Sequence, residues 1–236
     1  MKEIEWSDAI EMISPKVFKI STQDGFGSGF LLYNSENNDI CSIATAAHVV
    51  SHAHAWRLPI KLQFSNSNEE IYITDQDRAI LVNEDLDTAV IFIDTSNIKI
   101  PGKSYGLTPE GKYIKIGIEI GWLGFPIISP NNLCFFAGRI SAYLEKSKAY
   151  LVDGVAINGV SGGPAFVKGL NDTITIIGLV SAYIPNRATN DVLPGLCMLS
   201  DVIQLQNIVK AFKSFEQAKE EELKKTSVTI PIIKGK

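Results

Sequence analysis

The sequence NGVSGGPAF, residues Asn158–Phe166, places three glycines and a proline around a single serine. Glycine loses more backbone freedom on folding than any other residue, so three glycines this close together indicate a specific structural or functional requirement. A plain turn is one interpretation, because Gly, Pro and Ser are common in turns. A catalytic loop is the other, because a nucleophilic serine needs backbone N–H groups that stabilise an oxyanion. We expect Ser161 to be the nucleophile, with the N–H groups of Gly159 and Ser161 as its oxyanion hole.

The same residues fit the pattern G-x-S-x-G from Gly159 to Gly163, which is the nucleophile elbow of the α/β-hydrolases. That elbow leads directly into a helix, and its histidine follows the serine in sequence. Here Pro164 and the strand-like residues after it interrupt such a helix. The chain has three histidines, and all of them precede the serine: His48, His52 and His54. Both departures argue against the hydrolase elbow and place the general base upstream of Ser161.

The candidate general base is His48, which lies in the apolar run IATAAHVV. A purely structural histidine is one alternative. A metal ligand is another, because His48 and His52 are one helical turn apart and His54 is close to them in sequence. However, no Cys, Asp or Glu lies among these histidines, and His54 is out of phase with the other two. We therefore expect neither a metal nor another cofactor.

A catalytic histidine is oriented by a buried carboxylate on its far side. Asp87 lies just before the apolar run Ala89–Ile93, at the N-terminal end of an expected core strand. Asp85 lies among other acidic residues, and we expect it to be solvated. The order His48, Asp87, Ser161 is that of chymotrypsin-type triads, whereas subtilisins have the order Asp, His, Ser. The set as a whole therefore favours a chymotrypsin-type arrangement.

Length and composition restrict the class of protein. With 236 residues, 45% of them hydrophobic and 20% charged, the chain suits one large all-β domain or two lobes that share a core. The net charge of −4, without a basic patch, argues against nucleic-acid binding. The N-terminus lacks the apolar run of a signal peptide, and no segment approaches a membrane span. Three widely spaced cysteines, Cys41, Cys134 and Cys197, indicate free thiols, so we expect a cytoplasmic protein that contacts no membrane.

Short runs of β-branched and aromatic residues, separated by turn residues, continue through most of the chain. A stretch rich in Gly and Pro at residues 100–112 divides these runs into two groups of roughly six. We expect a single domain over residues 1–236. Within it, the N-terminal barrel covers about residues 14–100, residues 100–112 form a linker, and the C-terminal barrel covers about residues 113–200.

The C-terminal part predicts a helix followed by an apolar tail. Hydrophobic residues recur at helical spacing over about residues 201–222, and Ser200 is in position to cap that helix. We expect the helix to pack on the second lobe. The tail at residues 227–236 contains SVTIPII, which has high β-propensity and no charge. We expect the tail to dock on an edge of its own barrel, or to add as a strand to another chain and so support self-association.

The motifs TAAHV, DTAV and GVSGGPAF resemble the three signatures of trypsin-like peptidases. The chain looks closest to the catalytic domain of the bacterial high-temperature-requirement (HtrA/Deg-type) proteases, over about residues 10–215. The resemblance extends to GFGSGFLL, GWLGFP, IIGLVSAY and GLCMLSDVI, at residues 25–32, 121–126, 176–183 and 195–203. It implies a chymotrypsin fold, with two six-stranded antiparallel β-barrels, a C-terminal α-helix and an active site between the barrels. The chain departs from the family in two ways: we expect no PDZ domain after the protease, and Val160 replaces the usual Asn before the serine.

The resemblance also implies a set of substrate-binding residues. Ser181 is expected to hydrogen-bond Asp87, and the backbone of Ser181, Ala182 and Tyr183 is expected to pair with the substrate as an added strand. The floor of the primary specificity pocket is implied at the sixth residue before the serine. That residue is Val155, and the pocket is expected to be narrowed by two further residues: Tyr183 and Cys197.

The expected function is that of a serine endopeptidase whose partner is a polypeptide substrate. In digestive trypsins an Asp before the serine pairs with a newly cut N-terminus, and Val160 cannot do so. We therefore expect activity to be set by the order of the loop Asp153–Asn158 or by a regulatory protein partner. The alternative is a catalytically silent domain that binds peptides or serves as a scaffold. The presence of all three triad residues argues against that alternative, and an esterase is a weaker candidate still.

Overall fold

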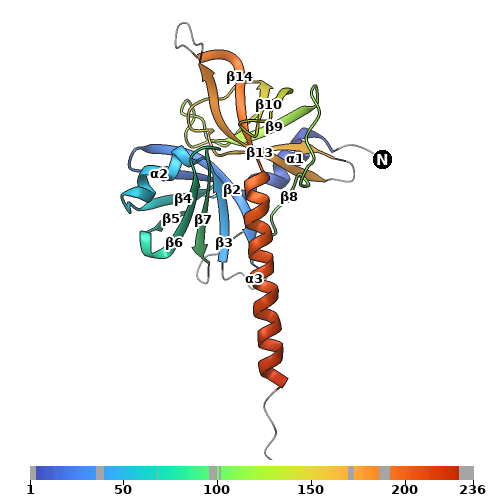
Figure 1. The fold of residues 1–236 in the computed structure, drawn as a ribbon. Helices are drawn as coiled ribbons and strands as arrows, with labels where there is room; N and C mark the ends of the chain where they lie inside the picture. The colour runs from blue at the N-terminus through green and yellow to red at the C-terminus, as the bar shows by residue number, and fades with distance from the viewer. Residues whose placement is uncertain are drawn as a thin grey trace, which may run out of the picture.

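In the computed structural model the chain forms two β-sheets side by side, with a long C-terminal helix that extends away from them (Figure 1). The structure describes residues 4–35, 40–67, 69–95, 100, 102–169, 173–185 and 192–228. The first half contains α1 (Trp6–Ile13), η1 (Ser14–Lys16), β1 (Val17–Thr22), β2 (Gly25–Asn34), β3 (Ile40–Thr45), α2 (Ala47–Ala55), β4 (Ile60–Phe64), β5 (Glu70–Ile73), η2 (Asp75–Asp77), β6 (Arg78–Asn83) and β7 (Thr88–Asp94). The second half contains β8 (Gly106–Leu107), β9 (Glu119–Gly124), β10 (Cys134–Leu144), β11 (Ala149–Asp153), β12 (Pro164–Lys168), β13 (Ile174–Pro185), β14 (Val192–Asp201) and α3 (Ile203–Val228).

The first sheet has seven strands in the order β5-β4-β1-β2-β3-β7-β6, and its neighbouring strands are antiparallel. In β4 every second side chain is buried, as the alternation of a half-buried strand requires: Ile60, Leu62 and Phe64. Helix α2 packs on this sheet through Val50 and Ala53. The sheet is therefore a curled half-barrel with one apolar face turned inward.

The second sheet has the order β12-β9-β10-β11-β14-β13-β8, and an additional pairing joins β12 to β13. That pairing closes six strands into a barrel, to which β8 adds in parallel alongside β13. Trp122, Tyr150 and Val152 are among the residues that fill this barrel. The predicted chymotrypsin-like fold class is confirmed, with the second sheet as the closed barrel and the first as a half-barrel of seven strands.

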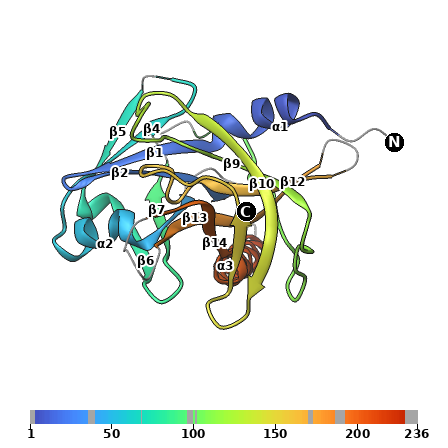
Figure 2. The ribbon, with the colours of Figure 1, turned by 90° about the horizontal axis from the view of Figure 1, so that it is seen from above.

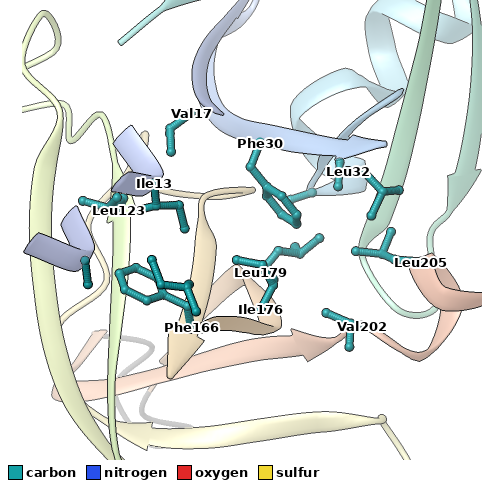
Figure 3. Close-up of a cluster of buried hydrophobic side chains, with 14 of the residues drawn as sticks. Ile13, Val17, Phe30, Leu32, Leu123, Phe166, Ile176, Leu179, Val202 and Leu205 are labelled. Carbon is teal, nitrogen blue, oxygen red and sulfur yellow. The ribbon is translucent and has the colours of Figure 1, made fainter. Parts of the chain in front are cut away.

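A shared apolar cluster joins the two lobes (Figure 3). It draws side chains from α1, both sheets and the beginning of α3, and Figure 3 shows them pointing toward one another. The labelled members are Ile13, Val17, Phe30, Leu32, Leu123, Phe166, Ile176, Leu179, Val202 and Leu205. Because interiors of this kind are packed as densely as organic crystals, the cluster fixes one lobe against the other.

Helix α3 runs from Ile203 to Val228, so it is longer than the sequence predicted. The expected Ser200 cap is wrong, because Ser200 belongs to β14 and its hydroxyl donates to the carbonyl of Leu86 at 2.7 Å. The carboxylate of Asp201 instead accepts a hydrogen bond from the N–H of Ile203 at 3.1 Å. A side-chain acceptor therefore does satisfy the first turn, but it comes from the residue after Ser200.

The expectation that α3 packs on the second lobe is also wrong for its later turns. The ring of Phe212 stacks on Phe92 of β7 at 4.8 Å and lies near Tyr33 of β2, whose hydroxyl donates to Glu216. Both partners belong to the first sheet, and Figure 2 shows α3 nearly end-on beside the strands. None of the described helices combines the length and the apolar character needed to cross a membrane. The tail prediction for residues 227–236 lies, from residue 229 onward, outside the described residues.

The glycines around Ser161 are required by close backbone packing. Gly162 has φ +84°, and a Cβ there would collide with the carbonyl oxygen of Ser28 and the hydroxyl of Thr45. A Cβ on Gly163 would collide with the carbonyl oxygen of Leu123. The cluster is therefore explained by a loop that lies directly against β2 and β9, with no room for side chains.

We predict that Gly162→Ala lowers the free energy of unfolding by about 3 kcal/mol or more, because it combines strain at positive φ with overpacking. Gly117→Ala is the matched control, since Gly117 has φ +86° but open space around its Cα. That control isolates the backbone strain and should cost about 1 kcal/mol. Urea unfolding of both variants measures the difference, and equal losses would show that close packing is not the cause.

Candidate active site

Three connections between strands bring the predicted triad residues to the junction of the two sheets. His48 is the second residue of α2, which begins directly after β3. Asp87 lies in the tight turn between β6 and β7, and Ser161 lies in the loop between β11 and β12. The first two residues are therefore carried by the first sheet and the third by the second, as the sequence led us to expect.

His48 and Asp87 form a well-defined pair. Nδ1 of His48 lies 2.9 Å from both carboxylate oxygens of Asp87, and the backbone N–H of His48 donates to Oδ1 at 3.0 Å. Because an ionised carboxylate can only accept, Nδ1 is the donor in this pair, and in the neutral imidazole Nε2 is then an acceptor. The carboxylate also sits at the N-terminus of α2, where a negative charge is stabilised.

Ser181 completes the surroundings of Asp87, as the family resemblance implied. Its hydroxyl donates to Oδ2 of Asp87 at 2.6 Å. Burial acts to raise the pKa of Asp87, but the hydrogen bonds from His48 and Ser181 outweigh it and hold the pKa below the ordinary value. The carboxylate is therefore ionised at neutral pH although it is largely buried.

The turn that carries Asp87 is strained and braced. Asp87 has φ +48°, which is uncommon for a residue with a side chain and recurs at functional sites. Its N–H donates to Glu84, the amide side chain of Asn83 accepts from Leu86, and Ser200 donates to the carbonyl of Leu86. Ser200 therefore connects β14 of the second barrel to the Asp87 turn.

Ser161 is half-buried and lies beside Ser181. Its hydroxyl donates to the carbonyl oxygen of Ser181 at 3.5 Å. Among the described residues, it makes no hydrogen bond to His48. Backbone hydrogen bonds fix the loop on both sides: Ser28 N–H donates to the carbonyl of Ser161 at 2.7 Å, and Gly162 N–H donates to Val180 at 2.6 Å. The structure therefore unites His48, Asp87 and Ser181 directly and places Ser161 next to them.

The backbone before Ser161 is held by hydrogen bonds to its carbonyl groups. Gly159 has φ +93°, which suits a residue without a side chain. The carbonyl of Asn158 accepts from Ile127 N–H at 2.7 Å, and the carbonyl of Gly159 accepts from the hydroxyl of Ser28 at 2.8 Å. Within the described part of the chain, the N–H groups of Gly159 and Ser161 donate to no backbone carbonyl. These two N–H groups are the candidate oxyanion donors.

Sequence reasoning missed Ser28. It is a fully buried polar residue in β2, and its hydroxyl accepts from Phe125 N–H while it donates to Gly159. The signal was present in GFGSGF, where a serine stands between glycines inside an apolar strand. A buried hydroxyl needs partners, and the absence of side chains on its neighbours lets other backbones supply them.

The candidate substrate-binding residues lie at one end of the second barrel. Val155 is 50% exposed in the loop after β11, whereas Cys197 is fully buried in the barrel core, where burial raises its thiol pKa to about 12. In β13 the backbones of Ala182 and Tyr183 pair with β14, while the described ladder with β12 ends at Leu179. Among the described residues, no strand therefore pairs with the other edge of β13 at Ala182 and Tyr183. The side chains of Ala182 and Tyr183 lie outside the part that the structure describes.

The other two histidines stand apart from this pair. His52 lies one turn further along α2, with Nδ1 in contact with the carboxylate of Asp24 and its ring near Trp56. His54 is exposed on the same helix. Among the residues with described positions, no group of three or more His, Cys, Asp or Glu side chains is placed so that it could hold a metal ion.

Comparison with known proteins agrees with the fold and identifies the family. The trypsin-like peptidase domain family matches residues 27–172, while no curated protein matches the sequence. The inactive form of Rv3671c from M. tuberculosis H37Rv, a serine-to-alanine mutant, shares the fold at TM-score 0.57 and 16% identity, over 95% of this chain and 92% of that one. The serine endoprotease from Yersinia pestis is similar at TM-score 0.62 and 17% identity, over 89% of this chain and 67% of that one. The fold and the family match lead to one conclusion: the chain belongs to the trypsin-like peptidase family and is a serine-type endopeptidase.

Proposed function

We propose that this peptidase cleaves polypeptides with Ser161 as nucleophile, His48 as general base and Asp87 as the carboxylate that orients the base. The observation that carries this proposal is the contact of Asp87 with both His48 Nδ1 and Ser181 Oγ, directly beside Ser161. It fixes the imidazole with Nε2 free to accept a proton. Catalytic hydrogen bonds often tighten only when substrate is bound, so the hydroxyl of Ser161 can turn from Ser181 to His48 at that stage.

The reaction follows from these positions. Ser161 Oγ attacks the peptide carbonyl carbon while Nε2 of His48 takes its proton, and Asp87 stabilises the resulting imidazolium. The oxyanion is held by the N–H groups of Gly159 and Ser161. His48 then returns the proton to the leaving amine, and water hydrolyses the acyl-enzyme by the same route. The open edge of β13 at Ser181–Tyr183 supports binding of the substrate as an added strand.

The surroundings of Ser161 also support a mode of regulation without N-terminal trimming. The side chain of Val160 is fully buried in the core of the second barrel, where no ion pair with an amine can form. We propose that activity depends on the order of the loop Asp153–Asn158 or on a regulatory protein partner. Cys41 and Cys197 are free and buried, which supports a reducing compartment such as the cytoplasm.

Removal of the nucleophile is the first test. Ser161→Ala should lower kcat for a peptide substrate by on the order of 10⁶-fold, and His48→Ala by a similar factor. The double variant should lose little more than either single variant, because triad residues act as a unit. Unfolding curves should show that all three variants remain folded.

A fluorophosphonate probe serves as the independent control, because it should modify Ser161 in the wild-type protein and nothing in Ser161→Ala. Adduct formation at a different serine, or cleavage that survives Ser161→Ala, would contradict the assignment. Wild-type protein that binds peptides but neither cleaves them nor reacts with the probe would instead favour a silent binding domain.

Asp87→Asn tests the orienting carboxylate. The amide keeps the shape but removes the charge and an acceptor that faces Nδ1, so kcat should fall roughly 10⁴-fold. Asp85→Asn is the matched control, because Asp85 is exposed in the same turn and should leave kcat within about twofold. Equal effects of the two substitutions would show that the triad assignment of Asp87 is wrong.

The lowered pKa of Asp87 also gives a pH dependence of stability. Its ionised form is the one that is hydrogen-bonded, so this stabilisation is present above the ordinary pKa of 3.8 and is lost as the pH falls through the lowered value. The gap in unfolding free energy between wild type and Asp87→Asn should therefore be constant near neutral pH and should shrink below about pH 4. Urea unfolding across this range measures the gap, and a gap that grows on acidification would contradict the lowered pKa.

The nature of Val155 predicts specificity. The half-exposed side chain of Val155 has no carboxylate that could pair with a Lys or Arg of the substrate. In a peptide library, cleavage should therefore occur mainly after Val, Ala or Leu. Val155→Asp should shift cleavage toward Lys and Arg, whereas Asp153→Asn should keep the apolar preference. Wild-type cleavage mainly after Lys or Arg would refute this assignment of the pocket.

A further inference from the structure

Two successive carbonyl groups in the loop before Ser161 are held by donors from elsewhere in the chain. The carbonyl of Asn158 accepts from the N–H of Ile127, in the connection between β9 and β10, at 2.7 Å. The carbonyl of Gly159 accepts from the hydroxyl of Ser28, in β2, at 2.8 Å. The loop is therefore fixed at two neighbouring peptide units by residues far from it in sequence.

The first of these contacts sets the direction of an oxyanion-hole donor. In a planar trans peptide the C=O and the following N–H point in opposite directions. With the carbonyl of Asn158 turned toward Ile127, the N–H of Gly159 points away from Ile127. A half-turn of this peptide unit would replace the donor with a carbonyl oxygen, which would repel an oxyanion. Glycine tolerates both orientations at little cost, so an external contact must choose between them.

The second contact is made by a hydroxyl with a defined direction. Ser28 is fully buried, and its Oγ accepts from Phe125 N–H at 2.9 Å, so its own proton is free for the carbonyl of Gly159. The carbonyl of Ser28 accepts from the hydroxyl of Thr45 at 2.7 Å. Ser28 is therefore itself immobilised, and it ties β2 to the connection after β9 and to the nucleophile loop.

Ile127 acts through its main chain. Its side chain is 57% exposed, so the side chain contributes little to the core. The N–H of Ser129 donates to the carbonyl of Pro126 at 2.8 Å, which places Ile127 at the second position of a β-turn. The N–H at that position takes no part in the turn and is free to serve Asn158.

We propose that the Ile127 N–H and the Ser28 hydroxyl form a clamp on two successive peptides, Asn158–Gly159 and Gly159–Val160, that keeps the Gly159 N–H in the orientation that serves the oxyanion hole. Both are positioning residues, because they act through these two peptides and touch no substrate. The proposal rests on the proposed function, since it assigns to Gly159 N–H the stabilisation of the tetrahedral intermediate. Loss of the clamp should thus affect the transition state more than substrate binding.

The main test compares two substitutions at one position. Ile127→Pro removes the N–H and suits the second position of a β-turn, whereas Ile127→Ala removes the side chain and keeps the N–H. We expect Ile127→Pro to lower kcat roughly 10- to 100-fold, since deletion of an oxyanion donor costs on the order of 10²- to 10³-fold. KM should stay within about twofold, and Ile127→Ala should remain close to wild type.

Two further readouts separate positioning from general structural damage. A peptide aldehyde, which forms a tetrahedral adduct with the serine, should lose affinity for Ile127→Pro by about the factor lost in kcat. The pH profile of kcat should keep its shape, because the clamp does not contact His48 or Asp87. Ser28→Ala should show the same pattern, accompanied by a lower Tm because two buried backbone groups lose their partner.

The outcomes are distinguishable. Ile127→Pro with wild-type kcat and aldehyde affinity would overturn the clamp, as would equal losses in Ile127→Pro and Ile127→Ala. A rise in KM together with a large fall in Tm for Ile127→Pro would assign the contact a structural role and also overturn it. Wild-type activity that is no higher than that of Ser161→Ala would instead show that the proposed function fails.

Discussion

The site depends on direct backbone-to-backbone packing between the nucleophile loop and strands β2 and β9. At Gly162 and Gly163 a single added carbon would meet carbonyl oxygens of these strands. This approach lets Ser28 reach the loop with both its N–H and its hydroxyl. Backbone polar groups that are buried must be paired, so close approach and hydrogen bonding reinforce each other. The result is a loop whose carbonyls at Asn158, Gly159 and Ser161 are satisfied by the fold, while the N–H groups of Gly159 and Ser161 donate to no backbone carbonyl of the described residues.

The electrostatics of the site centre on one partly buried carboxylate. Asp87 would be destabilised by burial alone, yet it is kept ionised by the imidazole and backbone of His48 and by the hydroxyl of Ser181. The same interactions orient the imidazole and cap α2. Ser200 of β14 donates a hydrogen bond to the carbonyl of Leu86, next to Asp87. The charge is therefore supported by elements of both sheets. A single anion thus organises the proposed general base, a helix terminus and a contact between the lobes.

The geometry of the proposed site is a property of the interface between lobes. His48 and Asp87 lie in connections between strands of the first sheet, whereas Ser161 lies in a connection of the second sheet and Ser181 in its strand β13. Their distances are therefore only as constant as the packing of the shared apolar cluster in Figure 3. Helix α3 adds a further connection, because its first turns enter that cluster and Phe212 stacks on the first sheet. Sites of this kind need a rigid supporting shell to hold reacting groups in position.

The sequence by itself determined the fold class, the family and the candidate triad, because these depend on local patterns: alternating apolar runs, a glycine cluster and the order of His48, Asp87 and Ser161. It did not reveal the half-barrel of seven strands or the face on which α3 packs. It assigned Ser200 to a helix cap, although that hydroxyl braces the Asp87 turn, and it gave Ser28 no role. These features were decided by the tertiary structure, because a hydroxyl or a helix face takes whichever partner the rest of the chain brings within reach. Contacts between residues more than a hundred positions apart leave no periodic trace in the sequence.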